Sequence, residues 1–172
     1  MARMSLIDRA RMGEVDAQCS LAWRLMSAGT PSSYRHAIPW LQRAAARQSR
    51  WAEYHLGLIY DDGLAGRKDW RLARKWYGRA ARKGFDSAQL NLGIILANLR
   101  GRHRDLEEAV RLYKLAARKG NRNAAYNLGL YYAKGRGVAR SPFVARRWYA
   151  KAAEAGDRTA AAALRRMKAG GA

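Results

Sequence analysis

Residues 121–156 read NRNAAYNLGLYYAKGRGVARSPFVARRWYAKAAEAG, and three earlier stretches of the chain repeat this pattern. Glycines close three such units at Gly84, Gly120 and Gly156, and the intervals 120−84 and 156−120 both equal 36 residues. A Leu-Gly pair keeps the same interval, at Leu56-Gly57, Leu92-Gly93 and Leu128-Gly129. A fixed period of this length is typical of a repeat array, in which each unit packs on its neighbours.

Each unit is expected to contain two helices, because apolar residues recur at helical spacing in two separate segments. In the second unit these positions are Ala52, Leu56, Ile59 and Tyr60 in the first segment, and Ala73, Trp76, Tyr77 and Ala80 in the second. Small residues beside large aromatics let neighbouring helices approach closely while the rings fill the gaps. The pattern predicts an all-α solenoid of about four helix-turn-helix repeats with terminal capping helices.

The expected repeats are residues 14–48, 49–84, 85–120 and 121–156, within a single domain. Residues 1–13 are expected to form an N-terminal cap, and residues 157–172 a polar C-terminal cap. The first repeat has Pro39 inside its second helix, so we expect that helix to bend or to start late.

Helix ends are also predicted at matched positions. Side-chain oxygens that can cap the second helices recur at Ser33, Asp69, Asp105 and Ser141. Asp105 is followed three residues later by Glu108, a spacing that resembles a capping box. The glycines that close the units are expected to adopt the left-handed conformation that ends a helix.

The charge of the chain is strongly positive. Its 172 residues include 34 Lys plus Arg against 13 Asp plus Glu, for a formal net charge of +21. Such an excess favours acidic protein surfaces, nucleic acids or anionic lipid headgroups by long-range attraction. One cysteine, Cys19, excludes an intrachain disulfide. No apolar run approaches the ~20 residues of a membrane span, and we expect a cytoplasmic protein.

The fourth unit carries a longer motif, Ala-x-Tyr-x-Leu-Gly-x-x-Tyr from Ala124, then Ala-x-x-Trp-Tyr and Ala-Ala-x-x-Gly ending at Gly156. This motif resembles the Sel-one-like repeat family, a relative of the tetratricopeptide repeats, from about residue 14 to the C-terminus. The third unit departs from the motif, with Leu99 and Arg102 in its turn. The resemblance implies a right-handed α/α superhelical solenoid whose members mostly act as adaptors that hold other proteins in a concave groove.

The first helices are expected to line that groove. Three aligned sets of positions are candidates for partner binding: Tyr54, Leu90 and Tyr126; His55, Asn91 and Asn127; Leu58, Ile94 and Leu130. A surface that mixes aromatic and amide side chains suits a protein partner. For some of these residues, packing between units is the alternative.

The second helices carry ordered cations opposite their apolar stripe. This basic band consists of Lys75, Arg79, Arg82, Arg111, Arg118, Arg147 and Lys151. Residues 109–153 contain 11 Lys or Arg and no acid. By analogy with tetratricopeptide arrays the band lies on the convex side, and it is either a binding surface or a solvated face.

Neither a catalytic set nor a metal or cofactor motif is found. His36, His55 and His103 lie too far apart in sequence for a helical metal pair, and the turn glycines lack a phosphate-loop sequence. We therefore expect a non-enzymatic adaptor that binds an acidic protein, with toxin neutralisation or signalling as specific versions. Nucleic-acid binding by the basic band is the alternative, and membrane attachment ranks last because no lipid anchor is present.

Overall fold

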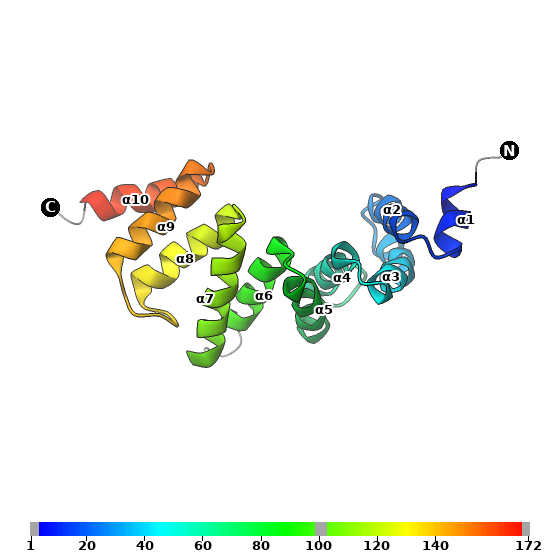
Figure 1. The fold of residues 1–172 in the computed structure, drawn as a ribbon, viewed down its shortest axis with the longest axis horizontal. Coiled ribbons are helices and arrows are strands. Elements are labelled where there is room, and N and C mark those ends of the chain that lie inside the picture. The colour runs from blue at the N-terminus through cyan, green and yellow to red at the C-terminus, as the bar shows by residue number, and fades with distance from the viewer. Residues whose placement is uncertain (1–3, 99–102, 170–172) are drawn as a thin grey trace. The chain divides into compact units, whose positions relative to one another are not determined.

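The computed structural model describes residues 4–98 and 103–169, and there it forms ten α-helices and no strand (Figure 1). The helices are α1 (Leu6–Arg11), α2 (Val15–Met26), α3 (Pro31–Ala46), α4 (Arg50–Asp62), α5 (Trp70–Arg82), α6 (Asp86–Asn98), α7 (His103–Arg118), α8 (Arg122–Lys134), α9 (Pro142–Glu154) and α10 (Arg158–Ala169). The all-α prediction is confirmed. The turn with Leu99 and Arg102 lies outside the described residues.

The helices form two compact units, residues 1–85 and residues 86–172. In the N-terminal unit, α2 packs on α3 and α4 packs on α5, while α1 covers α2. In the C-terminal unit, α6 packs on α7 and α8 on α9, and α10 packs on α9. Each helix pair is therefore one helix-turn-helix, as the two apolar segments per repeat predict.

In the second, third and fourth repeats the Leu-Gly pair meets a tyrosine of the second helix, whereas the first repeat has Leu21-Ala22. A Cβ atom built on Gly57 would lie 2.4 Å from the ring of Tyr77. The equivalent distances are 2.6 Å from Gly93 to Tyr113 and 2.5 Å from Gly129 to Tyr149. Only glycine leaves room for the ring at these positions, and all three tyrosines are buried, with at most 4% of their surface exposed.

The starts of two second helices agree with the sequence. The side chain of Asp69 accepts hydrogen bonds from Arg71 and Leu72, and that of Ser141 accepts one from Val144. The closing glycines also agree, with φ of 76° at Gly84, and with 89° and 86° at the two later ones. These residues end the second helices because glycine adopts positive φ without strain.

The predicted start of α3 is wrong. Thr30 caps this helix. Its hydroxyl accepts a hydrogen bond from the backbone N–H of Ser33, and its own backbone N–H donates to Oγ of Ser33, which therefore lies inside the first turn. This reciprocal capping box, with Pro31 in the first turn, begins the helix three residues earlier than expected. Pro39 consequently lies inside a helix that runs to Ala46, and the late start predicted from it is also wrong.

The predicted start of α7 is wrong as well. The helix begins at His103, so Asp105 lies within its first turn instead of before it. Glu108 does not complete a capping box, because its carboxylate accepts two hydrogen bonds from the guanidinium of Arg111, at 2.6 and 2.7 Å. A carboxylate in the first turn still interacts favourably with the helix dipole.

The glycine-tyrosine contact can be tested with one substitution at two sites. Gly57→Ala should destabilise the protein by about 1–3 kcal/mol, because the new methyl group overlaps the buried Tyr77 ring. Gly78→Ala in α5 is the matched control, since its Cβ meets only the flexible end of Arg82 at 3.7 Å. Alanine should there gain up to about 1 kcal/mol from helix propensity. Urea unfolding, followed by circular dichroism, measures the stability of both variants. Equal changes in stability would contradict the contact between Gly57 and Tyr77.

Candidate functional site

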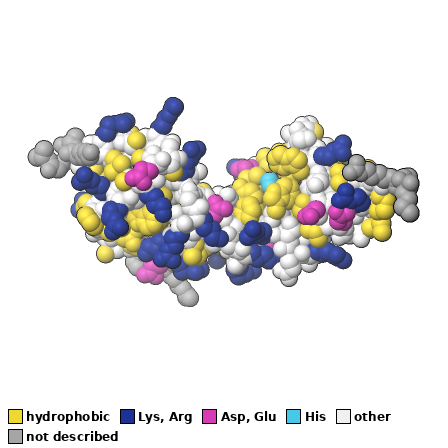
Figure 2. All heavy atoms as spheres, turned by 45° about the horizontal axis from the view of Figure 1, so that its top comes forward, with side chains coloured by type: hydrophobic (Ala, Val, Ile, Leu, Met, Phe, Trp, Pro, Cys, Tyr) yellow, Lys and Arg dark blue, Asp and Glu magenta, His cyan; other side chains and the backbone are white. Residues whose placement is uncertain are grey.

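An exposed aromatic cluster lies on the first helices of the N-terminal unit. The ring of Trp23 on α2 is 6.4 Å from that of Trp51 and 6.1 Å from that of His55, both on α4. Trp51 and His55 are closer still, with ring centroids 4.0 Å apart. Trp23 is 58% exposed, although its neighbours are half-buried. The space-filling view shows an apolar area around a histidine on this unit (Figure 2).

The local sequence explains how α4 presents this cluster. Ser49 caps the helix by accepting a hydrogen bond from the backbone N–H of Ala52, which places Trp51 in the first turn. His55 follows Trp51 by four residues, so the two side chains share one face of the helix. Glu53 and Gly57, on the opposite side of the helix, are buried, so the face with Trp51 and His55 is directed outward.

Two hollows flank Trp23. One has a volume of about 670 Å³ and is lined by Asp16, Cys19, Ser20, Trp23, Arg24, Ser49 and Trp51. The other, of about 150 Å³, is lined by Trp23, Met26, Ser27, Tyr34, His55, Leu58, Ile59 and Leu64. The indole therefore lies between a larger hollow, whose lining includes Asp16 and Arg24, and a smaller, mainly apolar hollow. This arrangement can receive two neighbouring side chains of a partner.

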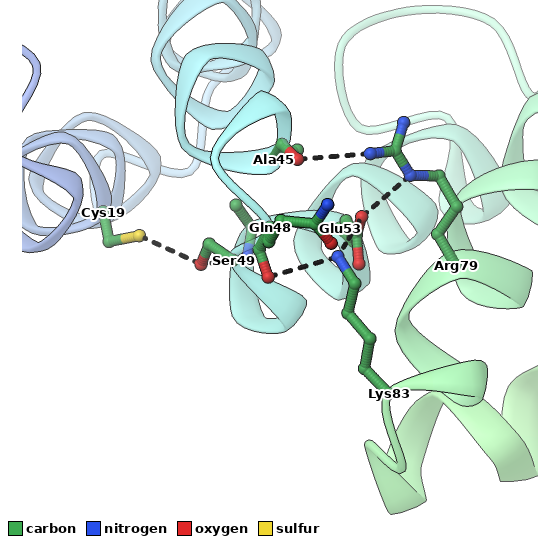
Figure 3. Close-up of polar contacts among 8 residues, drawn as sticks. Cys19, Ala45, Gln48, Ser49, Glu53, Arg79 and Lys83 are labelled. Carbon is green, nitrogen blue, oxygen red and sulfur yellow. Dashed lines mark hydrogen bonds and ion pairs between the residues drawn. The ribbon is translucent and has the colours of Figure 1, made fainter.

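Two titratable side chains beside Trp23, His55 and Cys19, are uncharged at physiological pH. Burial lowers the pKa of His55 from 6.5 to about 4, so the imidazole is neutral at physiological pH. Cys19 is half-buried, with Sγ 3.5 Å from Oγ of Ser49 (Figure 3), and burial raises the pKa of its thiol. A neutral imidazole and a protonated thiol add to an uncharged recognition surface. In the described part of the chain, no three His, Cys, Asp or Glu side chains gather as metal ligands.

The structure divides the predicted groove residues between the two units. In the N-terminal unit Tyr54, His55 and Leu58 lie together on α4, and His55 and Leu58 share the smaller hollow. In the C-terminal unit Ile94 is 39% exposed, and Asn91, Tyr126, Asn127 and Leu130 are half-buried on α6 and α8. All nine positions thus lie on first helices, and all but one are at least partly exposed.

The exception is Leu90, which is buried with 7% of its surface exposed and cannot line a groove. Its helix, α6, buries a wide arc of residues, including Gln89 and Leu96, and leaves Ile94 exposed. The position that a partly exposed tyrosine holds in the neighbouring repeats is therefore enclosed in this one. The expected role of Leu90 is wrong for this reason.

The most exposed member of the cluster, Trp23, was not among the predicted residues. It precedes Leu58 by 58−23 = 35 residues, the interval that also relates Ala17 to Ala52. Trp23 therefore belongs to the same aligned series as Leu58, Ile94 and Leu130, and this register could have identified it. Trp51 gives no such signal, because its equivalents in the later repeats, Ser87 and Asn123, are small and polar.

One member of the predicted basic band, Arg79, has a structural role. Its Nε donates to Oε1 of Glu53 at 2.8 Å, and its Nη2 donates to the carbonyl of Ala45 at 3.2 Å (Figure 3). Lys83 donates to the same carboxylate oxygen at 2.8 Å and to the carbonyl of Gln48 at 3.1 Å. Because Glu53 is completely buried, these two cations tie α5 to α4 and to the end of α3.

The other members of the band remain at the surface. Lys75, Arg82, Arg118, Arg147 and Lys151 are exposed, while Arg111 is exposed but paired with Glu108. Arg79 should therefore be removed from the predicted binding band, since its charge neutralises a buried carboxylate.

Repeated helix pairs that present aromatic side chains from their first helices define a class of helical repeat proteins. A model of the Sel1 repeat matches residues 15–49, 52–85, 86–121 and 122–157. The chain therefore belongs to the Sel1 repeat family, which confirms the resemblance seen in the sequence. Sel1 repeat proteins generally mediate protein–protein interactions and are typically non-enzymatic scaffolds.

Solved structures share this fold. A protective antigen of uropathogenic Escherichia coli with an SLR fold has 36% identity and a TM-score of 0.82, over 90% of this chain and 33% of that one. A Sel1 repeat protein from Oxalobacter formigenes has 28% identity and a TM-score of 0.78, over 92% of this chain and 64% of the other. This chain spans a third of the first protein and under two thirds of the second.

A more distant structure, of a sel1 repeat protein from Klebsiella pneumoniae, has 20% identity and a TM-score of 0.52, over 93% of this chain and 96% of that one. It shows the fold alone. A search of curated proteins found no match. Among the described residues, no helix is both long and apolar enough to cross a bilayer.

The pKa of His55 predicts how stability depends on pH. Because it is about 4 in the folded protein and near 6.5 when exposed, the unfolded chain binds the proton first as the pH falls. The contribution of His55 to stability should be intact above pH 6.5 and should decrease towards pH 4. His55→Gln should therefore flatten the decrease of the urea midpoint over this range, and His36→Gln, at an exposed site, is the control. An unchanged slope in His55→Gln would contradict a neutral, buried imidazole.

The Glu53 contacts predict a large loss of stability. The double variant Arg79→Met/Lys83→Met leaves a buried carboxylate without a cation and should lower the free energy of unfolding by about 3–5 kcal/mol. Lys75→Met, on the exposed side of the same helix, should change it by less than about 0.5 kcal/mol. Adding Glu53→Leu to the double variant should restore most of the loss. Thermal unfolding measures the stability of all three variants. If Glu53→Leu restores no stability, the unpaired carboxylate is not the cause of the loss.

Proposed function

We propose that this chain is a non-enzymatic adaptor that binds a segment of an acidic partner protein through the aromatic cluster of its N-terminal unit. The observation that carries the proposal is Trp23, a large apolar side chain that is 58% exposed between two hollows. Tryptophan is enriched among the residues that contribute most to protein–protein binding, especially where it inserts between neighbouring pockets. The packing of the repeats does not require this exposed indole.

The composition of the cluster supports a protein partner. Trp23, Trp51 and His55 supply its aromatic surface, and Asp16 and Arg24 add charged groups to the lining of the larger hollow. A central apolar region with a polar rim is the usual anatomy of a protein interface. The predicted groove residues Tyr54, His55 and Leu58 belong to this surface, and their counterparts Asn91, Ile94, Tyr126, Asn127 and Leu130 would serve the same purpose on the C-terminal unit.

The net charge of +21 supports an acidic partner, because complementary charge raises the rate of association and disfavours basic competitors. Toxin neutralisation and signalling are two roles that such an adaptor could serve, and the identity of the captured protein decides between them. The family's scaffold character and the neutral His55 beside Trp23 support a role in binding instead of catalysis.

A pair of tryptophan variants tests the proposal. Trp23→Ala should weaken partner binding by about 2 kcal/mol or more, roughly 30-fold, because an interface anchor is lost. Trp70→Ala is the matched control, since Trp70 is also an exposed indole, at 48%, but lies at the start of the second helix α5. Quantitative affinity capture from cells should recover the partner with the wild type and with Trp70→Ala, and much less with Trp23→Ala. Equal recovery with both variants would contradict the proposed surface.

A further inference from the structure

The last second helix, α9, carries an exposed aromatic ring that the fold does not use. Phe143 is 72% exposed, close to the highest value among the large apolar residues of the described chain. The equivalent positions of the other repeats, at intervals of 36 residues, are charged: Arg35, Arg71 and Glu107. Phenylalanine is costly on a solvated face, and its presence here needs a reason other than packing.

Cations accompany the rings on this face. The guanidinium of Arg147 lies 6.0 Å from the centre of the Phe143 ring, and the ammonium of Lys151 lies 5.6 Å from that of Trp148. Phe143, Arg147 and Lys151 follow one another at intervals of four residues, which places them on one side of the helix. Val144, Arg147, Trp148 and Lys151 line a hollow of about 280 Å³. The face therefore combines accessible rings, positive charge and a concave surface.

Comparison with α5 shows that these cations are not needed inside the protein. The position of Lys151 corresponds to Arg79, whose charge neutralises the buried Glu53. The position of Glu53 corresponds in α8 to Ala125, because 53+72 = 125, so that carboxylate is missing from the fourth repeat. Within the described residues, neither Arg147 nor Lys151 forms a hydrogen bond or an ion pair, and both are exposed.

The surroundings are also positive. Residues 109–153 contain 11 Lys or Arg and no acid, and the stretch includes all of α8 and α9 up to Ala153. The first acid after Lys151 is Glu154, at the end of α9. Figure 2 shows Lys and Arg side chains gathered over this unit. This face therefore favours a ligand that carries negative charge.

We propose that the α9 face, defined by Phe143, Arg147, Trp148 and Lys151, binds single-stranded nucleic acid. Unpaired bases stack on accessible aromatic rings while the phosphates of the same strand meet the cations, a combination found in proteins that bind single strands without sequence preference. An acidic peptide would use the cations and has no need of Phe143, and in a duplex the bases are stacked on one another and inaccessible to the ring. This binding goes beyond the adaptor function, because it uses neither Trp23 nor the N-terminal unit.

Fluorescence anisotropy with a labelled single-stranded oligonucleotide of mixed sequence, titrated with the full chain over a salt series, tests the proposal. Phe143→Ala should weaken binding about tenfold and leave the salt dependence unchanged, because it removes stacking and no charge. Arg147→Gln/Lys151→Gln should reduce the slope of log affinity against log salt by about 1.4, or 0.7 per lost phosphate contact. Phe143 is too exposed for its replacement to threaten folding, which circular dichroism verifies.

The matched control is Arg43→Gln/Lys75→Gln. It removes the same charge from two other second helices, where Arg43 and Lys75 also lie over tryptophan rings, at 4.8 and 5.9 Å. Its affinity and salt slope should stay near those of the wild type. Unchanged binding in Phe143→Ala would overturn the proposal, as would equal losses in the two charge variants. Polyglutamate or phosphatidylserine vesicles that bind with the same dependence on Phe143 would overturn it in favour of an acidic protein or a membrane.

Discussion

The contact between a helix glycine and a buried tyrosine ring is the constraint on which the second, third and fourth repeats depend. At Gly57, Gly93 and Gly129 the ring of the second helix lies where a Cβ atom would be, at 2.4 to 2.6 Å from its ideal position. The two helices can approach so closely only because the side chain is absent. Since glycine costs about 1 kcal/mol of helix propensity relative to alanine, the packing of the ring must offset that loss in these three repeats.

The glycine–tyrosine contact joins the two helices of one repeat. In the N-terminal unit, a buried ion-pair group also joins neighbouring repeats. Glu53 is fully buried, and Arg79 and Lys83 both donate to one of its oxygens. Each cation also donates to a backbone carbonyl at the end of α3, so the same groups satisfy the preceding repeat. Removing one partner of this group would leave a buried charge unpaired, which costs far more stability than the intact group contributes. Gln89 and Ala125 hold the equivalent positions later in the chain.

The repeat period predicts most of the fold, because the residues that set it are those that pack. Leu-Gly pairs, buried tyrosines and closing glycines all lie where the register places them. The start of α3 was mispredicted because a local cap, Thr30 with Ser33, prevails over the register. Helix α7 begins at His103, two residues before the predicted cap Asp105. Burial of Leu90 could not be foreseen, since it depends on how wide an arc of α6 is buried. The role of Arg79 was hidden as well, because a carboxylate in sequence gives no sign that it is buried.

The repeat register also distinguishes residues that packing explains from residues that packing does not explain. Positions that repeat faithfully, such as Gly57 and Tyr77, are explained by packing, whereas Trp23 and Phe143 interrupt their series with large exposed rings. Trp23 stands in a series of aliphatic residues on first helices, and Phe143 in a series of charged residues on second helices. An exposed ring that replaces a residue adequate for the fold adds apolar surface without adding to the core. The two departures occur in different units and on different helix types, so they mark two surfaces whose binding can be tested independently.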